Sequence, residues 1–225
     1  RNSTKHSLSR LQTDMPFSSE KLPNEWRKGS IEFNASWTTQ GAGGRGIEEY
    51  CSELLIKPED LYGKKVLDIG AGLRAELARG LIGKADVISV SPDYSLPEYQ
   101  KHVADLGDKA VPALGQDLPF KGASFDVVVM LHVTEHVSQE DLAKIVQEAY
   151  RVLKPGGTLY IAPLLNHPSL VNSVDTVKRS LPRAAQISFD TNGLTTRFDL
   201  REDPSGPHMY VRTDLYRAAI RKPLK

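Results

Sequence analysis

Residues 64–78 read KKVLDIGAGLRAELA, a short apolar run that ends in a glycine turn. Val66–Ile69 has the composition of a buried parallel strand, and apolar residues at helical spacing begin at Leu73. A strand that breaks into a glycine turn and then a helix is the usual start of a nucleotide-binding α/β domain. Gly70 and Gly72 let the backbone approach a ligand where a Cβ would obstruct it. We expect the helix beginning near Leu73 to point its N–H groups at that ligand.

Asp68 separates two classes of ligand. Gly70, Gly72 and Ala75 fit the dinucleotide spacing G-x-G-x-x-G/A, which alone is weakly specific. A carboxylate beside the helix N-terminus would repel a pyrophosphate. Asp68, two residues before the first glycine, can instead meet a positively charged or hydrogen-bond-donating ligand. The stretch therefore favours a cationic ligand, and an ordinary strand-turn-helix without a ligand stays the alternative.

The composition is that of an ordinary globular protein. Of the 225 residues, 25% are charged and 40% are hydrophobic. The net charge of +1 gives no global field that would recruit nucleic acid or an anionic membrane. Cys51 is the only cysteine, which excludes an internal disulfide and a cysteine-based zinc cluster. No apolar run approaches the roughly 18 residues of a membrane helix. No signal-peptide pattern opens the sequence, so we expect a cytoplasmic protein.

The first 45 residues differ from the rest of the chain. They are polar, lack sustained periodicity and contain both tryptophans, Trp26 and Trp37. We expect residues 1–45 to form an arm that is fixed to the domain surface or closes over the ligand as a lid. Residues 46–225 are expected to form one α/β domain. The glycine-rich run 41–46 has no preceding strand and no P-loop Lys-Ser/Thr, so it predicts a flexible hinge.

Apolar periodicity predicts alternating helices and strands beyond the arm. Ser138 is expected to cap a helix that Pro155-Gly156-Gly157 ends. The last two strands should form an antiparallel pair, followed by a short basic helix at the end of the chain. The other expected helices are 47–56, 73–83, 97–106 and 169–181, and the expected strands are 66–69, 86–90, 110–114, 127–131, 158–162, 196–201 and 208–213.

Four motifs occur in an order that resembles one family. They are Asp68-Ile69-Gly70-Ala71-Gly72, Gln116-Asp117-Leu118-Pro119-Phe120, Ser124-Phe125-Asp126 and Lys154-Pro155-Gly156-Gly157. Residues 47–215 resemble class I S-adenosylmethionine (SAM)-dependent methyltransferases of the small-molecule type, similar to methyltransferase type 11. SAM has no phosphate and carries an ammonium group, which suits Asp68. The resemblance implies an α/β, Rossmann-like fold with a mostly parallel seven-stranded sheet, helices on both faces and a C-terminal antiparallel strand.

The resemblance also implies residues that bind SAM and its product S-adenosylhomocysteine. Such enzymes usually end the second strand with an acidic residue that holds the ribose. This sequence has Ser91 there, so either Ser91 gives a single hydrogen bond or Asp93 reaches back. Asp117 is the candidate acceptor for the adenine amine, and Leu118 for the ring contact. The full set of expected contacts is Asp68, Gly70, Ala71, Gly72, Ser91, Asp93, Gln116, Asp117, Leu118 and Leu131.

His132 and His136 follow the predicted strand 127–131. Their spacing would place both on one helical face, as in a zinc pair, but they do not read H-E-x-x-H and a third ligand is not evident. We therefore predict no metal site. The segment resembles the loop near the substrate entrance of small-molecule methyltransferases. Histidine titrates near neutrality, so His132 is a candidate general base and His136 a second one. Structural histidines are the alternative.

The resemblance implies methyl transfer from SAM by in-line attack of a nucleophile on the sulfonium methyl group. A small-molecule acceptor is expected, while nucleic-acid and protein acceptors stay open and no membrane partner is expected. The acceptor atom and the oligomeric state are not predicted. The alternative is a catalytically silent SAM-fold protein that binds a partner or regulates it, which Ser91 supports. A dinucleotide oxidoreductase is a third hypothesis, disfavoured by Asp68.

Overall fold

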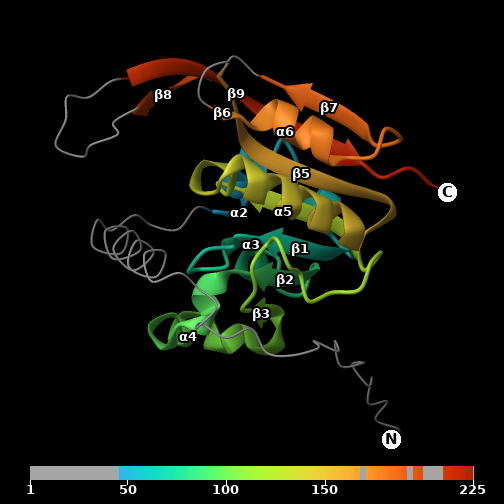
Figure 1. Cartoon of the computed structure of the whole chain (residues 1–225). Helices are drawn as coiled ribbons and strands as arrows, with labels where there is room; N and C mark the ends of the chain where they lie inside the picture. Colours follow the sequence, from blue (N-terminus) through green and yellow to red (C-terminus); the bar gives the residue numbers. More distant parts are fainter. Residues whose placement is uncertain (1–45, 168–170, 192–194, 200–209, 225) are drawn as a thin grey trace, which may run out of the picture.

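A twisted mixed sheet forms the centre of the molecule in the computed structural model, which describes residues 46–167, 171–191, 195–199 and 210–224 (Figure 1). Its main path runs β3-β2-β1-β4-β5-β9-β7, with β6 paired to β5 and β8 paired to β9. Strands β1 to β5 are parallel, and β9 is antiparallel to both β5 and β7. The strands are β1 (Lys65–Ile69), β2 (Asp86–Val90), β3 (Ala110–Val111), β4 (Phe125–Leu131), β5 (Leu153–His167), β6 (Val171–Asn172), β7 (Gln186–Asp190), β8 (Thr195–Asp199) and β9 (Tyr210–Arg221).

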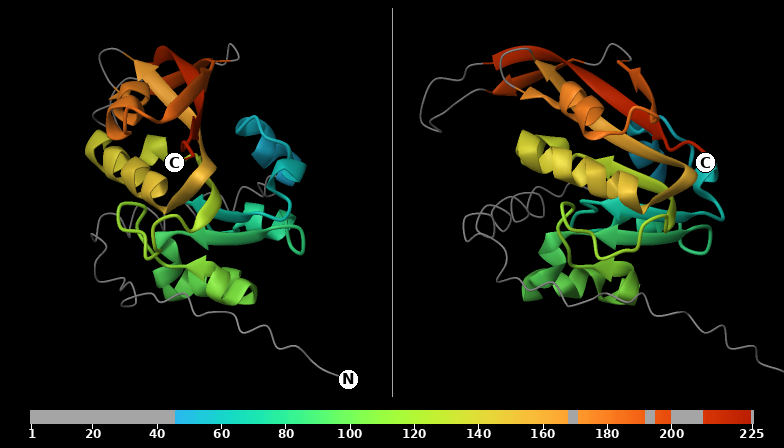
Figure 2. Two further views of the ribbon diagram at one scale, coloured as in Figure 1. Left: turned by 90° about the vertical axis from the view of Figure 1, so that its right-hand side faces the viewer. Right: turned by 45° about the vertical axis from the view of Figure 1, so that its right-hand side comes forward.

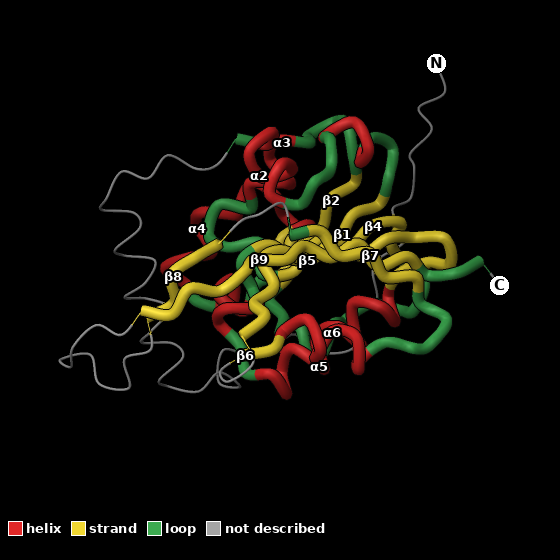
Figure 3. Tube along the Cα trace, turned by 90° about the horizontal axis from the view of Figure 1, so that it is seen from above, coloured by secondary structure: helices red, strands yellow, loops and turns green. Residues whose placement is uncertain are grey.

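Helices cover both faces of this sheet (Figures 2 and 3). One face packs against α5 (Gln139–Val152) and α6 (Ser173–Ser180). The other packs against α2 (Ile47–Glu53), α3 (Glu76–Gly80) and α4 (Pro97–Val103). The predicted Rossmann-like fold, with its antiparallel strand near the C-terminus, is confirmed. No described helix is long and apolar enough to cross a membrane. The predicted arm, residues 1–45, lies outside the described residues.

The longest helix, α5, forms where the sequence predicts it. The Ser138 side chain accepts a hydrogen bond from the Asp141 N–H at 3.0 Å, which satisfies one of the free donors in the first turn. An apolar stripe then buries one face of the helix against the sheet, through Leu142, Ile145, Val146, Ala149 and Val152. The helix ends when Leu153 becomes extended and starts β5.

Two predicted elements are wrong. The first crossover helix does not begin near Leu73, because Ala75 adopts a left-handed conformation (φ 47°) and α3 starts only at Glu76. The basic C-terminal helix is absent from residues 210–224, where β9 continues to Arg221. Pairing with β5 on one side and β7 on the other holds this segment extended, and such pairing overrides local propensity.

Strand β7 was not predicted. The predicted antiparallel pair near 196–213 is confirmed as β8 and β9.

Lys222, just after β9, joins the end of the sheet to α5. Its ammonium group donates to the carbonyl oxygens of Tyr150 and Leu153 at 2.8 and 2.7 Å. It also lies 4.9 Å from the centroid of the Tyr150 ring. A cation at a helix C-terminus satisfies free carbonyls and offsets the helix dipole.

Lys222→Met should lower the free energy of unfolding by about 1–2 kcal/mol, because two helix-end carbonyls lose their charged donor while the aliphatic stem stays. Urea unfolding measures the change. Lys121→Met, at an exposed loop lysine, is the control and should stay within about 0.5 kcal/mol of wild type. Equal stability of the two variants would show that the Lys222 contact is not stabilising.

Candidate active site

The predicted site residues gather at one edge of the sheet. Because β1, β2 and β4 are parallel and in register, with Ile69 beside both Val90 and Met130, their carboxyl ends meet there. Gly70 follows β1, Ser91 follows β2 and Leu131 ends β4. The connections lead from β1 toward β2 on one side and from β4 toward β5 on the other. This reversal of strand order is where open α/β sheets bind ligands.

Asp68 is completely buried at this edge, on the face covered by α2. Its Oδ1 accepts a hydrogen bond from the Tyr50 hydroxyl of α2 at 2.7 Å. Its Oδ2 has no hydrogen-bond partner among the described residues, and neither does the hydroxyl of Ser89, its neighbour on β2. Burial raises the pKa of Asp68 to about 7, although the bond from Tyr50 lowers it. Buried carboxylates rarely keep an oxygen unpaired, so this one calls for an explanation.

A bound cation or hydrogen-bond donor supplies that explanation. The ammonium group of SAM offers positive charge and three donors to an oxygen that lacks one. This fit concerns charge and hydrogen bonding, and it agrees with the expectation from the sequence that Asp68 meets a cationic ligand. The nearby Glu76 on α3 raises the pKa of Asp68 further, which adds to the effect of burial.

Asp68 should lower the stability of the free protein as pH rises. Its folded pKa of about 7 exceeds the unfolded value of 3.8, so the folded state retains a proton that the unfolded chain releases between these values. Relative to Asp68→Asn, wild type should lose several kcal/mol between about pH 4 and 8, at roughly 1.4 kcal/mol per pKa unit. Urea unfolding of both proteins across this range, without ligand, measures the difference. A constant difference would contradict a raised pKa.

The glycine turn differs in detail from the prediction. A Cβ on Gly70 (φ 75°) would come within 2.4 Å of Val133 Cγ2, so protein rather than ligand excludes a side chain there. The N–H groups of Gly70 and Ala71 donate to the Val90 carbonyl oxygen at 2.8 and 3.1 Å. Gly72 (φ 63°) faces open space. Its carbonyl accepts from the Tyr94 hydroxyl at 2.7 Å, which ties the turn to the segment after β2.

Alanine at the two glycines should therefore have unequal effects. Gly72→Ala should cost about 1–2 kcal/mol of stability from left-handed strain alone. Gly70→Ala adds a clash worth about 1–3 kcal/mol more. Adding Val133→Ala should recover the clash component in the Gly70 variant and none in the Gly72 variant. Chemical denaturation of wild type, the two glycine variants and the two double variants with Val133→Ala tests this. Equal losses of stability for both glycine variants would refute the steric explanation.

Ser91 and Asp93 lie side by side after β2: Ser91 caps the turn η3 (Pro92–Ser95), and Asp93 belongs to it. The Ser91 hydroxyl donates to Asp93 Oδ2 at 3.2 Å, and both side chains are buried. The structure thus places a carboxylate two residues after Ser91, the position at which the resemblance implies an acidic residue. The sequence leaves two candidates for the ribose contact, Ser91 and Asp93, and this geometry is compatible with a contact from the Asp93 carboxylate.

The 116–120 loop is held from behind by α5. Glu148 accepts from the Leu118 N–H at 3.0 Å, and Arg151 donates to the carbonyls of Leu118 and Phe120 at 3.1 and 2.8 Å. Leu118 itself is buried in the core, so its side chain and N–H already have partners. Gln116 is half-buried, and the Asp117 side chain is exposed. Asp117 is therefore the loop's exposed carboxylate.

His132 occupies the first position after β4, in a left-handed conformation (φ 56°). Its Nδ1 lies 2.8 Å from Glu135 Oε1, and its Nε2 lies 2.7 Å from Glu53 Oε2 on α2. When both carboxylates are ionised, each ring nitrogen must donate, which is the imidazolium form. His136, in the turn η5 (Thr134–His136), is exposed and does not share this arrangement. Among the described residues, no group of His, Cys, Asp and Glu could hold a metal.

Sequence reasoning missed Tyr50 and Glu53. Both belong to the predicted helix 47–56, where neither residue stands out as a candidate for the site. One helical turn apart, they contact Asp68 and His132 respectively. The available signal was that a buried tyrosine hydroxyl needs a polar partner, but periodicity cannot identify that partner. Cys51 beside them is buried, and its pKa is raised to about 11 by burial, as expected for a core thiol.

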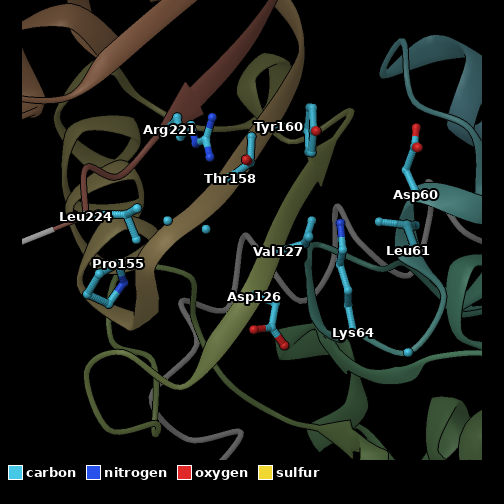
Figure 4. A pocket seen from close by; sticks show the side chains of 13 residues that line it. Asp60, Leu61, Lys64, Asp126, Val127, Pro155, Thr158, Tyr160, Arg221 and Leu224 are labelled. Atoms are coloured by element: carbon cyan, nitrogen blue, oxygen red, sulfur yellow. The ribbon is translucent and has the colours of Figure 1, made fainter.

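A pocket of about 450 Å³ lies elsewhere, at the amino ends of β1, β4 and β5 (Figure 4). Lys64, Tyr160 and Arg221 line it, together with Asp126. Asp126 accepts from Lys154 Nζ at 2.7 Å and from the Lys65 N–H at 2.9 Å. Although burial raises the pKa of Asp126, these bonds bring it below its usual value. None of the predicted site residues lines this pocket, so it is distinct from the carboxyl edge.

The chain is similar to a known protein family and to several known proteins. The family model for a methyltransferase domain matches residues 67–161, which run from β1 into β5. The uncharacterized protein MJ1123 of Methanocaldococcus jannaschii is 34% identical over 146 residues, 65% of this chain and 68% of that protein. The chain belongs to the class I SAM-dependent methyltransferases. The cofactor of this methyltransferase family is SAM.

The methyltransferase also resembles solved structures. Magnesium protoporphyrin IX methyltransferase from Synechocystis PCC 6803, solved with bound SAM, matches with a TM-score of 0.55 and 14% identity over 86% of this chain and 92% of that one. The 1,6-didemethyltoxoflavin-N1-methyltransferase of Burkholderia thailandensis matches with a TM-score of 0.52 and 14% identity over 93% of each chain. At these identities the likeness shows the fold.

Ubiquinone biosynthesis O-methyltransferases are partial relatives of the methyltransferase. The mitochondrial enzyme of Rattus norvegicus is 32% identical over 108 residues, which cover 45% of this chain and 31% of that enzyme. The enzyme of Pseudomonas putida strain F1 is 29% identical over 142 residues, 55% of this chain and 56% of that enzyme. The chain thus spans less than two thirds of the length of these two relatives.

Proposed function

We propose that this protein transfers the methyl group of SAM to a small-molecule acceptor. The observation that carries the proposal is Asp68 Oδ2, a buried carboxylate oxygen without a described partner at the switch point of the sheet. In the proposed complex Asp68 holds the ammonium group, Asp93 with Ser91 the ribose, and Asp117 the adenine. Gly70, Ala71, Gly72, Gln116, Leu118 and Leu131 shape the surrounding turns. Bound SAM supplies an electrophilic methyl group on a sulfonium, so the protein mainly orients the reactants.

The proposal of a small-molecule acceptor is supported by the names of similar proteins. The solved structures of similar fold include enzymes named for a porphyrin and for a toxoflavin precursor, and the partial relatives are named for ubiquinone biosynthesis. The first two names describe small organic acceptors, and the third describes the synthesis of a small organic molecule. Protein and nucleic-acid acceptors have no comparable support here, since the net charge is only +1.

His132 stays the candidate base, under one condition. A base must have an unprotonated nitrogen, whereas both ring nitrogens here contact carboxylates. We propose that His132 accepts a proton only after it has passed one of its own to Glu53 or Glu135. Acceptors that are already nucleophilic, such as a neutral amine, need no base, and for them the three residues position the acceptor side of the site.

Binding of SAM by the full chain tests the proposal. Titration calorimetry with SAM and with S-adenosylhomocysteine should give micromolar dissociation constants for wild type. Asp68→Asn should weaken SAM binding by about 10- to 100-fold, because a charge-assisted hydrogen bond is lost. Asp126→Asn, which changes a carboxylate at the opposite edge of the sheet, is the control and should bind like wild type if it remains folded.

Methyl transfer is then assayed with radiolabelled SAM and a panel of phenols, amines and carboxylic acids. Label transferred to one acceptor class supports the enzyme. Tight SAM binding without transfer to any tested acceptor would favour the catalytically silent protein. If neither SAM nor S-adenosylhomocysteine binds, the proposed function is wrong for this chain.

A further inference from the structure

Helix α2 reaches Asp68 through one tyrosine. The Tyr50 side chain is buried, and its hydroxyl donates to Asp68 Oδ1 at 2.7 Å. It is the only hydrogen bond to either Asp68 oxygen among the described residues, because Oδ2 has no partner. A helix that precedes β1 in the sequence therefore determines how the carboxylate of β1 is held.

This bond fixes the direction of the carboxylate. A carboxylate with two unpartnered oxygens can turn about its terminal bond, since this torsion is broad and roughly two-fold. With Oδ1 bound by Tyr50, Oδ2 is left as the oxygen for a ligand. Other described groups act electrostatically on Asp68, but none of them donates a hydrogen bond to it in place of Tyr50. Glu76 on α3 adds negative charge, and the Tyr94 hydroxyl on η3 donates to Gly72 instead.

We propose that Tyr50 is a positioning residue for the cofactor: its hydroxyl holds Asp68 so that Oδ2, ionised, meets the ammonium group of SAM. The inference rests on the proposed function, because it assumes that SAM binds at Asp68. It goes further in assigning a role to a residue outside the cofactor motifs, on a helix that packs over the site. Tyr50 acts through Asp68 and needs no contact with the cofactor.

The chemistry predicts a link between binding and proton release. A hydroxyl donor favours the charged carboxylate, and the Tyr50 bond does lower the pKa of Asp68 against the effect of burial. Near neutral pH the free protein therefore holds Asp68 partly protonated, and binding of an ammonium group expels that proton. Without the hydroxyl, more of the free protein is protonated at Asp68, so more protons leave on binding and the affinity falls.

Tyr50→Phe tests this role. At about pH 7 its dissociation constant for SAM should rise about tenfold, equivalent to one charge-assisted hydrogen bond. The ratio of variant to wild-type constants should shrink as pH rises toward about 9, because Asp68 is then ionised in both proteins. Calorimetry in buffers of different ionisation enthalpy counts the protons, and the variant should release more than wild type at neutral pH.

Two further proteins separate this role from a packing effect. Tyr160→Phe removes a half-buried tyrosine hydroxyl on the same sheet face, from a residue of β5 that lines the other pocket, and should bind SAM like wild type at every pH. In the Asp68→Asn background, adding Tyr50→Phe should neither weaken binding nor change proton release, because no ionisable carboxyl remains at position 68. Circular dichroism confirms that each variant is folded.

The outcomes distinguish this inference from the proposed function. If wild type does not bind SAM, the proposed function fails and the inference with it. If wild type binds and Tyr50→Phe has the same affinity and the same proton release, the inference alone is wrong. A loss of affinity that is independent of pH and persists in the Asp68→Asn background also overturns it, because such a loss reflects packing of α2.

Discussion

One buried carboxylate constrains the rest of this site. Asp68 stands in β1 between two parallel neighbours, with Ser89 on one side and Val129 on the other, and it is removed entirely from water. An ionised group in such a position is costly unless a donor or a cation compensates it. The fold supplies one donor through Tyr50, and in the proposed complex the ammonium group of SAM supplies another. Under this proposal, the buried Asp68 carboxylate both destabilises the free protein and provides affinity for the cofactor.

The surrounding loops are held by backbone and side-chain contacts from several elements. The turn after β1 is held by Val90 and Tyr94, and the loop before β4 by Glu148 and Arg151 of α5. Two of the site's turns contain non-glycine residues in the left-handed conformation, Ala75 and His132. Strain of this kind persists only where neighbouring structure enforces it, and it is common at functional sites. The site is therefore built largely before a ligand arrives.

The sequence predicted the elements whose signal is local. The apolar run of β1, the Ser138 cap and the stripe of α5 all appear where their patterns placed them, because burial and capping act over a few residues. Only the part of β9 after residue 213 was predicted as a helix, and it is extended because it pairs with β5 and β7, which are distant in sequence. Tyr50 and Glu53 escaped notice for the same reason. Their roles depend on partners 18 and 79 residues away, which periodicity does not reveal.

The position of β9 also affects how the chain folds during synthesis. Strand β7 leaves the ribosome before β9, yet β9 lies between β7 and β5 in the sheet. Until β9 emerges, β7 lacks the neighbour that joins it to the sheet, and β5 exposes the edge that β9 will cover. Unpaired edges of this kind are sites of mispairing and aggregation. Until β9 has been made, the sheet of five parallel strands therefore stays open on the side of β5.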